Sequence, residues 1–168
     1  DHVNQARRLF SANCANCHRY NGHDGRGFPV DGNQSAPDLA GVASVNWLKK
    51  LLDYDHYVSK EYFGGTTFKN GKMATKVLKK FTEEDKALVP KVAALLSDLA
   101  NLPYQNKLSE EEREEGFNLF FDDLACIDCH DIEDENEGTA PDLTGYATRE
   151  WLIDIISDPA HERFYGKD

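Results

Sequence analysis

The cysteines of the chain fall into two pairs, and each pair is followed at once by a histidine. The residues are Cys14, Cys17 and His18 in the first run and Cys126, Cys129 and His130 in the second. A C-x-x-C-H run puts two thiols and an imidazole on one helical turn, the spacing that attaches haem c covalently through its vinyl groups. The histidine then falls beneath the iron as an axial ligand. The sequence therefore predicts two covalently bound haem c groups.

Zinc is the alternative, because two C-x-x-C pairs can form one tetrahedral site. Zinc, however, does not require a histidine after each pair. Nor does it explain a second repeated motif, which reads A-P-D-L-A-G at residues 36–41 and A-P-D-L-T-G at residues 140–145. The pattern favours haem.

The chain repeats itself at a distance of about 100 residues, which indicates domain duplication. The A-P-D-L segments and the W-L pairs that follow them recur with a shift of 104, whereas the cysteines shift by 112. The first copy therefore holds eight extra residues after its haem motif, within the glycine-rich segment 19–35, which we interpret as a loop insertion.

Helices must position these motifs, and apolar periodicity and capping residues predict where they lie. We expect helices over 3–13, after Ser44, after Phe81, after Ser109 and after Thr148, and few strands. The prediction is an all-α fold with units at residues 1–103 and 104–168. The second unit has no counterpart of the helix that closes the first, so we expect it to be truncated at its C-terminus.

Together, the two C-x-x-C-H runs, the two A-P-D-L-x-G segments and the duplicated helical layout resemble dihaem members of the class I cytochrome c family. Trp151-Leu152, followed by D-P and R-F-Y-G, is similar to cytochrome c subunits or domains of cytochrome bc-type quinol oxidoreductases. The resemblance implies two tandem cytochrome c-like domains that transfer electrons between redox proteins of a respiratory-type chain. It further implies that the chain is an electron carrier rather than an enzyme. The expected location is the periplasm or the outer face of the cytoplasmic membrane, where the chain could be a subunit of a membrane complex. In this family the prolines, here Pro37 and Pro141, offer their carbonyls to the axial histidines.

The resemblance also directs attention to the sixth ligands. Met73 is the single methionine and lies on a Gly- and Lys-rich loop before the closing helix, where the family places its distal ligand. Its polar flanks argue against a core position, so we expect the pair His18/Met73. For haem 2 the counterpart of Met73 falls near position 175, past the end of the sequence. His161, which roughly matches His56, is the alternative ligand.

Charge separates the two halves of the chain. The net charge is −11, made of +3 over residues 1–103 and −14 over residues 104–168, which excludes a nucleic-acid partner. Five lysines surround the predicted ligand loop, and either form a solvated face or dock a redox partner: Lys69, Lys72, Lys76, Lys79 and Lys80. Acidic runs at 110–115 and 131–137 give the second unit the opposite charge.

Two alternatives to electron transfer remain open. A dihaem peroxidase-like enzyme would use an open sixth position at haem 2 to react with peroxide. A ligand sensor would bind a small gas molecule at the same position. Peroxide turnover and carbon monoxide binding separate these functions from outer-sphere electron transfer.

Overall fold

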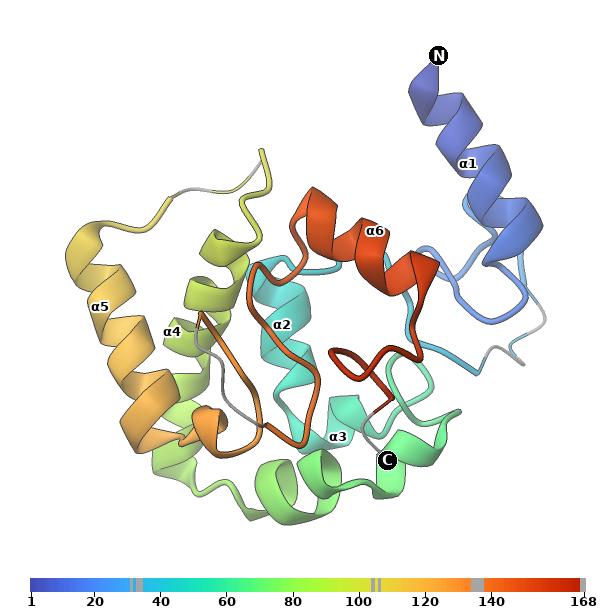
Figure 1. Ribbon diagram of the computed structural model, residues 1–168. Helices are drawn as coiled ribbons and strands as arrows, with labels where there is room; N and C mark the ends of the chain where they lie inside the picture. The colour runs from blue at the N-terminus through green and yellow to red at the C-terminus, as the bar shows by residue number, and fades with distance from the viewer. Residues whose placement is uncertain (31, 33–34, 104, 106, 134–137, 167–168) are drawn as a thin grey trace. The chain divides into compact units, whose positions relative to one another are not determined.

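The computed structural model describes residues 1–30, 32, 35–103, 105, 107–133 and 138–166. Over these residues the chain is helical and forms no strand (Figure 1). Isolated backbone bridges join Arg19 to Asp38 and, within the loop insertion, Tyr20 to His23 and His23 to Pro29. The predicted all-α class is therefore confirmed.

Contacts divide the chain into two compact units. Asp1–Val42 and Asn46–Thr82 form the first unit, and Ala43–Val45 and Glu83–Asp168 form the second. This division differs from the expected boundary at residue 103, because the helix that follows Thr82 has its contacts in the second unit.

The first unit is built from helices, most of them short. These are α1 (His2–Asn13), α2 (Val45–Leu51), α3 (Tyr54–Tyr57), the 3-10 helices η1 (Thr67–Asn70) and η3 (Leu78–Lys80), and the π-helix η2 (Met73–Val77). Its core is a cluster of Tyr57, Ala74 and Leu78. Helix α1 forms as predicted but contains no buried residue, and its Leu9 side chain is 56% exposed.

The second unit is helical as well, and its helices follow in chain order. These are α4 (Glu83–Leu99), α5 (Glu110–Asn118), the π-helix η4 (Leu119–Asp123), the 3-10 helix η5 (Cys126–Asp128) and α6 (Arg149–Ser157). As predicted, Ser109 and Glu112 form a reciprocal capping box on α5, and the Thr148 hydroxyl caps α6 by accepting from Trp151 N.

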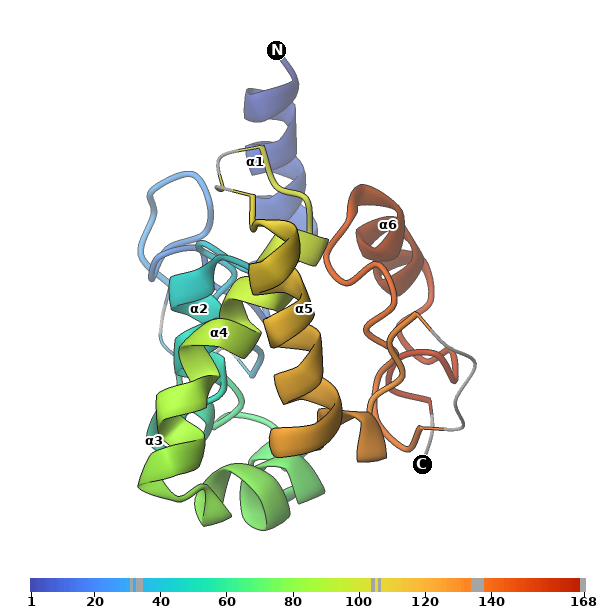
Figure 2. The same cartoon turned by 90° about the vertical axis from the view of Figure 1, so that its left-hand side faces the viewer.

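Helices α4 and α5 lie side by side in both views of the chain (Figures 1 and 2). The pairing is close because Gly116 has no side chain: a Cβ at this position would lie 2.9 Å from the Leu95 Cβ. The buried carboxylate of Asp98 closes the far end of the pair, where it accepts hydrogen bonds from Leu108 N and the Arg113 guanidinium. Helix α5 then continues into η4, which leads to the second cysteine pair.

The two copies differ just before their cysteines. An L-F pair precedes Cys14 by five and four residues but precedes Cys126 by seven and six. The two extra residues coincide with the π-helix η4, whose wider turn takes up additional chain within a helix. Ala125 then adopts a left-handed conformation, with φ at 47°, and the chain enters the second haem motif.

Candidate haem-binding sites

The histidines of the two C-x-x-C-H runs make the same hydrogen bond. His18 Nδ1 lies 2.8 Å from the carbonyl oxygen of Pro37, and His130 Nδ1 lies 2.8 Å from that of Pro141. A carbonyl can only accept, so the ring proton sits on Nδ1 and the lone pair on Nε2 is left for a metal. The structure therefore brings together each histidine and proline that the sequence singled out.

The cysteines of each pair share a helical turn with their histidine. The histidine backbone N–H donates to the carbonyl of the first cysteine in both copies, at 2.8 Å for His18 and 3.0 Å for His130. All four cysteines are free thiols, and Cys17 is the exposed one. Burial raises the pKa of the Cys126 thiol to about 11. Free thiols on one turn suit covalent attachment to a porphyrin.

Burial also sets the protonation of His130. Removal of the ring from water lowers its pKa below the usual 6.5, and this effect outweighs the opposing contributions of the Pro141 carbonyl and Asp131. The imidazole is therefore neutral at pH 7. A neutral ring with its proton on Nδ1 is the form that binds iron.

The segments that carry the two prolines are held by matching backbone bonds. Ala36 N donates to Cys17 O at 3.0 Å, and Ala140 N donates to Cys129 O at 2.9 Å. The indole N–H groups also hold these segments in both copies. Trp47 donates to Asp38 O at 3.0 Å, and Trp151 donates to Asp142 O at 3.1 Å. Sequence analysis found both tryptophans through the repeat but missed this role.

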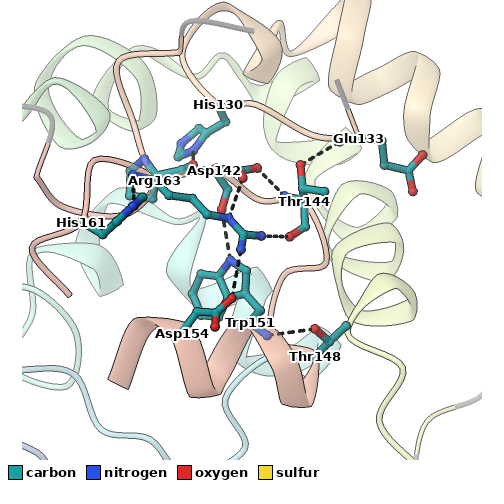
Figure 3. A network of polar contacts seen from close by, with 10 residues as sticks. His130, Glu133, Asp142, Thr144, Thr148, Trp151, Asp154, His161 and Arg163 are labelled. Carbon is teal, nitrogen blue, oxygen red and sulfur yellow. Dashed lines mark hydrogen bonds and ion pairs between the residues drawn. The ribbon is translucent and has the colours of Figure 1, made fainter. Parts of the chain in front are cut away.

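Arg163 ties the second proline segment to its surroundings (Figure 3). Its Nε lies 2.8 Å from the Asp142 carboxylate, its Nη2 2.8 Å from Thr144 O and its Nη1 3.2 Å from the Asp154 carboxylate. Burial alone would raise the pKa of Asp142, but the hydrogen bonds from Thr144 and Arg163 outweigh it and hold that pKa below 3.8. The aspartate is thus ionised at neutral pH.

Met73 begins the π-helix η2 and is half-buried. It packs against the cluster of Tyr57, Ala74 and Leu78. Its polar flanks therefore do not keep it away from apolar neighbours, and it lies at the edge of this cluster as a partly buried side chain. The segment is helical rather than an irregular loop, so Lys72 and Lys76 lie exposed while Met73 points to apolar neighbours.

His161 has a local role in a turn. Its Nδ1 accepts from Arg163 N at 3.1 Å, as the Ser59 hydroxyl accepts from Glu61 N at 3.3 Å. Gly166 N and Gly64 N donate to the carbonyls of His161 and Ser59, so His161 corresponds to Ser59 and not to His56. A neutral ring that accepts at Nδ1 carries its proton on Nε2, which counts against His161 as an iron ligand in this conformation.

The charged surfaces are only partly as expected. All five lysines around Met73 are exposed, and Lys79 also lies over the Tyr54 ring at 5.7 Å. Glutamates 110–112, 114 and 115 are exposed as well. Asp131, however, is 5% exposed and accepts from Gly138 N, because it anchors the chain after the haem motif. Residues 134–137 of the second acidic run lie outside the described residues.

Haem fits the donor set of both motifs. Each motif offers free thiols on a helical turn and a histidine whose Nδ1–H is taken up by the proline carbonyl, so that its Nε2 lone pair is free to bind iron. Within the part of the chain that the structure describes, no cluster of three or more His, Cys, Asp and Glu side chains is arranged to hold a bare metal ion. In the same residues, no helix is long and apolar enough to span a membrane.

A protein-family model agrees with this chemistry. The cytochrome c model matches residues 3–99, which include the first haem motif, the first A-P-D-L segment and Met73. No curated protein and no solved structure matches the chain at a significant level. The family match spans more than half of the sequence, and the chain therefore belongs to the cytochrome c family, whose members bind haem covalently and transfer electrons.

Proposed function

We propose that the chain is a dihaem cytochrome c that transfers electrons between redox proteins without chemistry at a bound substrate. The family match covers the first haem motif. The second haem rests on the hydrogen bond between His130 and Pro141, which has the same 2.8 Å length as that between His18 and Pro37. Haem supplies an iron that cycles between ferrous and ferric states.

The residues of the chain bind and orient this group in both units. Cys14 and Cys17 hold haem 1 by thioether bonds, and Cys126 and Cys129 hold haem 2. In our proposal residues 1–103 and 104–168 are tandem cytochrome c domains that share the α4–α5 contact. The matching contacts of Ala36 and Ala140, and of the two tryptophans, support this duplication.

The sixth ligand of haem 1 is Met73 in this proposal. A thioether opposite histidine raises the reduction potential, so this ligand pair raises the potential of haem 1. The packing of Met73 beside Tyr57, Ala74 and Leu78 is compatible with a ligand held in one orientation, but it also fits a core side chain. The two roles differ in whether the sulfur is needed. For haem 2 we assign no sixth ligand.

The partners we propose are redox proteins that recognise charge. The exposed lysines around Met73 suit an acidic partner at haem 1, and the exposed glutamates of α5 suit a basic partner at the second unit. Such a carrier operates in the periplasm or on the outer face of the cytoplasmic membrane, where it serves a respiratory chain alone or within a quinol oxidoreductase complex.

A redox titration tests the function. The holoprotein should take up and release two electrons per chain reversibly, at two resolved potentials, and should not consume peroxide after partial reduction. Uptake of a single electron per chain would contradict the proposed second haem. Sustained peroxide turnover would favour the peroxidase-like alternative, and carbon monoxide binding with no electron transfer to ferricyanide would favour the sensor.

A further inference from the structure

The two copies anchor the aspartate that follows the histidine-contacting proline in different ways. In the first copy the Asp38 carboxylate accepts from the backbone N–H groups of Asn21 and Gly22, at 2.8 and 2.9 Å, and from Ala40 N at 2.9 Å. The first two donors belong to the glycine-rich insertion. The second copy lacks that insertion, and the Asp142 carboxylate pairs with Arg163 instead.

Arg163 has no equivalent in the first copy. Asp38 N donates to Glu61 O and Asp142 N donates to Arg163 O, both at 2.8 Å, so Glu61 stands where the second copy has arginine. The guanidinium thus replaces the two backbone donors of the insertion. Its side chain is 31% exposed and that of Asp142 is 18% exposed, so the pair is partly shielded from water and screened less than a surface pair.

All three guanidinium nitrogens have acceptors in the protein. Two of them hold the A-P-D-L-T-G segment, through the Asp142 carboxylate and the Thr144 carbonyl, and the third reaches Asp154 on α6. Figure 3 shows the arginine extended between these groups. The carbonyl of Pro141, one residue before Asp142, accepts the hydrogen bond from His130 Nδ1–H.

We propose that Arg163 is the positioning residue of haem 2: it fixes the Pro141 carbonyl against His130 and thereby sets the strength of that hydrogen bond. The inference rests on the proposed second haem. A firm Nδ1–H···O=C bond makes Nε2 a more basic ligand, which favours ferric iron and lowers the reduction potential. A loosened segment weakens the bond and raises the potential.

Arg163→Lys tests the role because it keeps the charge but cannot donate to three separated acceptors. We expect the haem 2 midpoint potential to rise while haem 1 keeps its value. Arg19→Lys is the matched control: Arg19 follows His18 and donates to Lys60 O, so this change should leave haem 2 unmoved. The haem 2 wave is the one that the change Met73→Leu does not shift.

A second readout does not depend on charge. The His130 Nδ1 proton should exchange with solvent faster in Arg163→Lys, and also in Asp142→Asn, which breaks the same pair from its other side. The His18 proton should exchange as in the wild type. An unchanged haem 2 potential with unchanged His130 exchange overturns the inference, and so does an equal shift of both haems.

The wild-type haem content separates the two possible failures. If the wild type carries haem on the first motif alone, the proposed function loses its second centre and Arg163 has no haem to position. If the wild type carries two haems and Arg163→Lys leaves both readouts unchanged, the dihaem proposal stands and only the role of Arg163 is lost.

Discussion

Gly116 of α5 lies against Leu95 of α4 so closely that an added Cβ would come within 2.9 Å of the Leu95 Cβ. We expect Gly116→Val to destabilise the protein by about 1–3 kcal/mol, because overpacking forces the helices apart. Chemical denaturation measures the change. Asn118→Val is the matched control: it places the same side chain at an exposed position of α5 and should cost well under half as much. Equal costs for the two variants would contradict the close pairing.

Met73 can be tested as a ligand without disturbing its packing. Leucine has a similar volume but no sulfur, so Met73→Leu should keep the stability of the cluster with Tyr57, Ala74 and Leu78. We expect the haem 1 potential to fall and the reduced protein to bind carbon monoxide at haem 1. An unaltered spectrum and potential would make Met73 a core residue only.

The exposed lysines are expected to control reaction with charged oxidants. Reversing Lys72, Lys76 and Lys79 to glutamate should slow oxidation of haem 1 by ferricyanide about tenfold, because the anion loses electrostatic attraction. The measurement is stopped-flow oxidation at about 0.1 M salt, where screening confines charge effects to about 10 Å.

The control for the lysines carries the same charge change elsewhere in the first unit. Glutamates at Lys49, Lys50 and Lys60, which are also exposed, should slow the reaction much less. Equal slowing by both triple variants would mean that net charge alone acts, and the docking face would be lost.

The capping box gives a pH dependence with a defined sign. Hydrogen bonds from the backbone and then the hydroxyl of Ser109 hold the pKa of Glu112 below 4.5. The carboxylate therefore contributes stability above pH 4.5, and this contribution is lost as the pH falls through the lowered folded-state pKa. Glu112→Gln should unfold at a lower temperature at pH 6 and lose less stability than the wild type toward pH 3. If the melting temperatures of the variant and the wild type fall by the same amount between pH 6 and pH 3, the capping box makes no such contribution.

Local features of this chain could be predicted from the sequence because they depend on neighbours within a few residues. The Ser109 box, the Thr148 cap and helix α1 follow from capping residues and periodicity. The cysteine spacing likewise places thiols and histidine on one turn. These features need no knowledge of the tertiary structure.

Features that depend on distant partners could not be predicted. The association of α4 with the second unit follows from the gap left by Gly116, which no local pattern indicates. The polar flanks of Met73 are misleading because a helical turn separates exposed lysines from a buried face. The hydrogen bond and ion pair between Arg163 and Asp142 join residues that are 21 positions apart in the sequence. The aspartate shared by both A-P-D-L segments is the one signal that could have indicated it.

The central claim is that haem is attached covalently at both motifs, and intact mass after denaturation tests it most directly. The account predicts a mass that exceeds the polypeptide by two haems, by one haem in the Cys14→Ala/Cys17→Ala variant, and by one haem in the Cys126→Ala/Cys129→Ala variant. A wild-type mass that equals the bare polypeptide, or exceeds it by a single haem, would contradict the account.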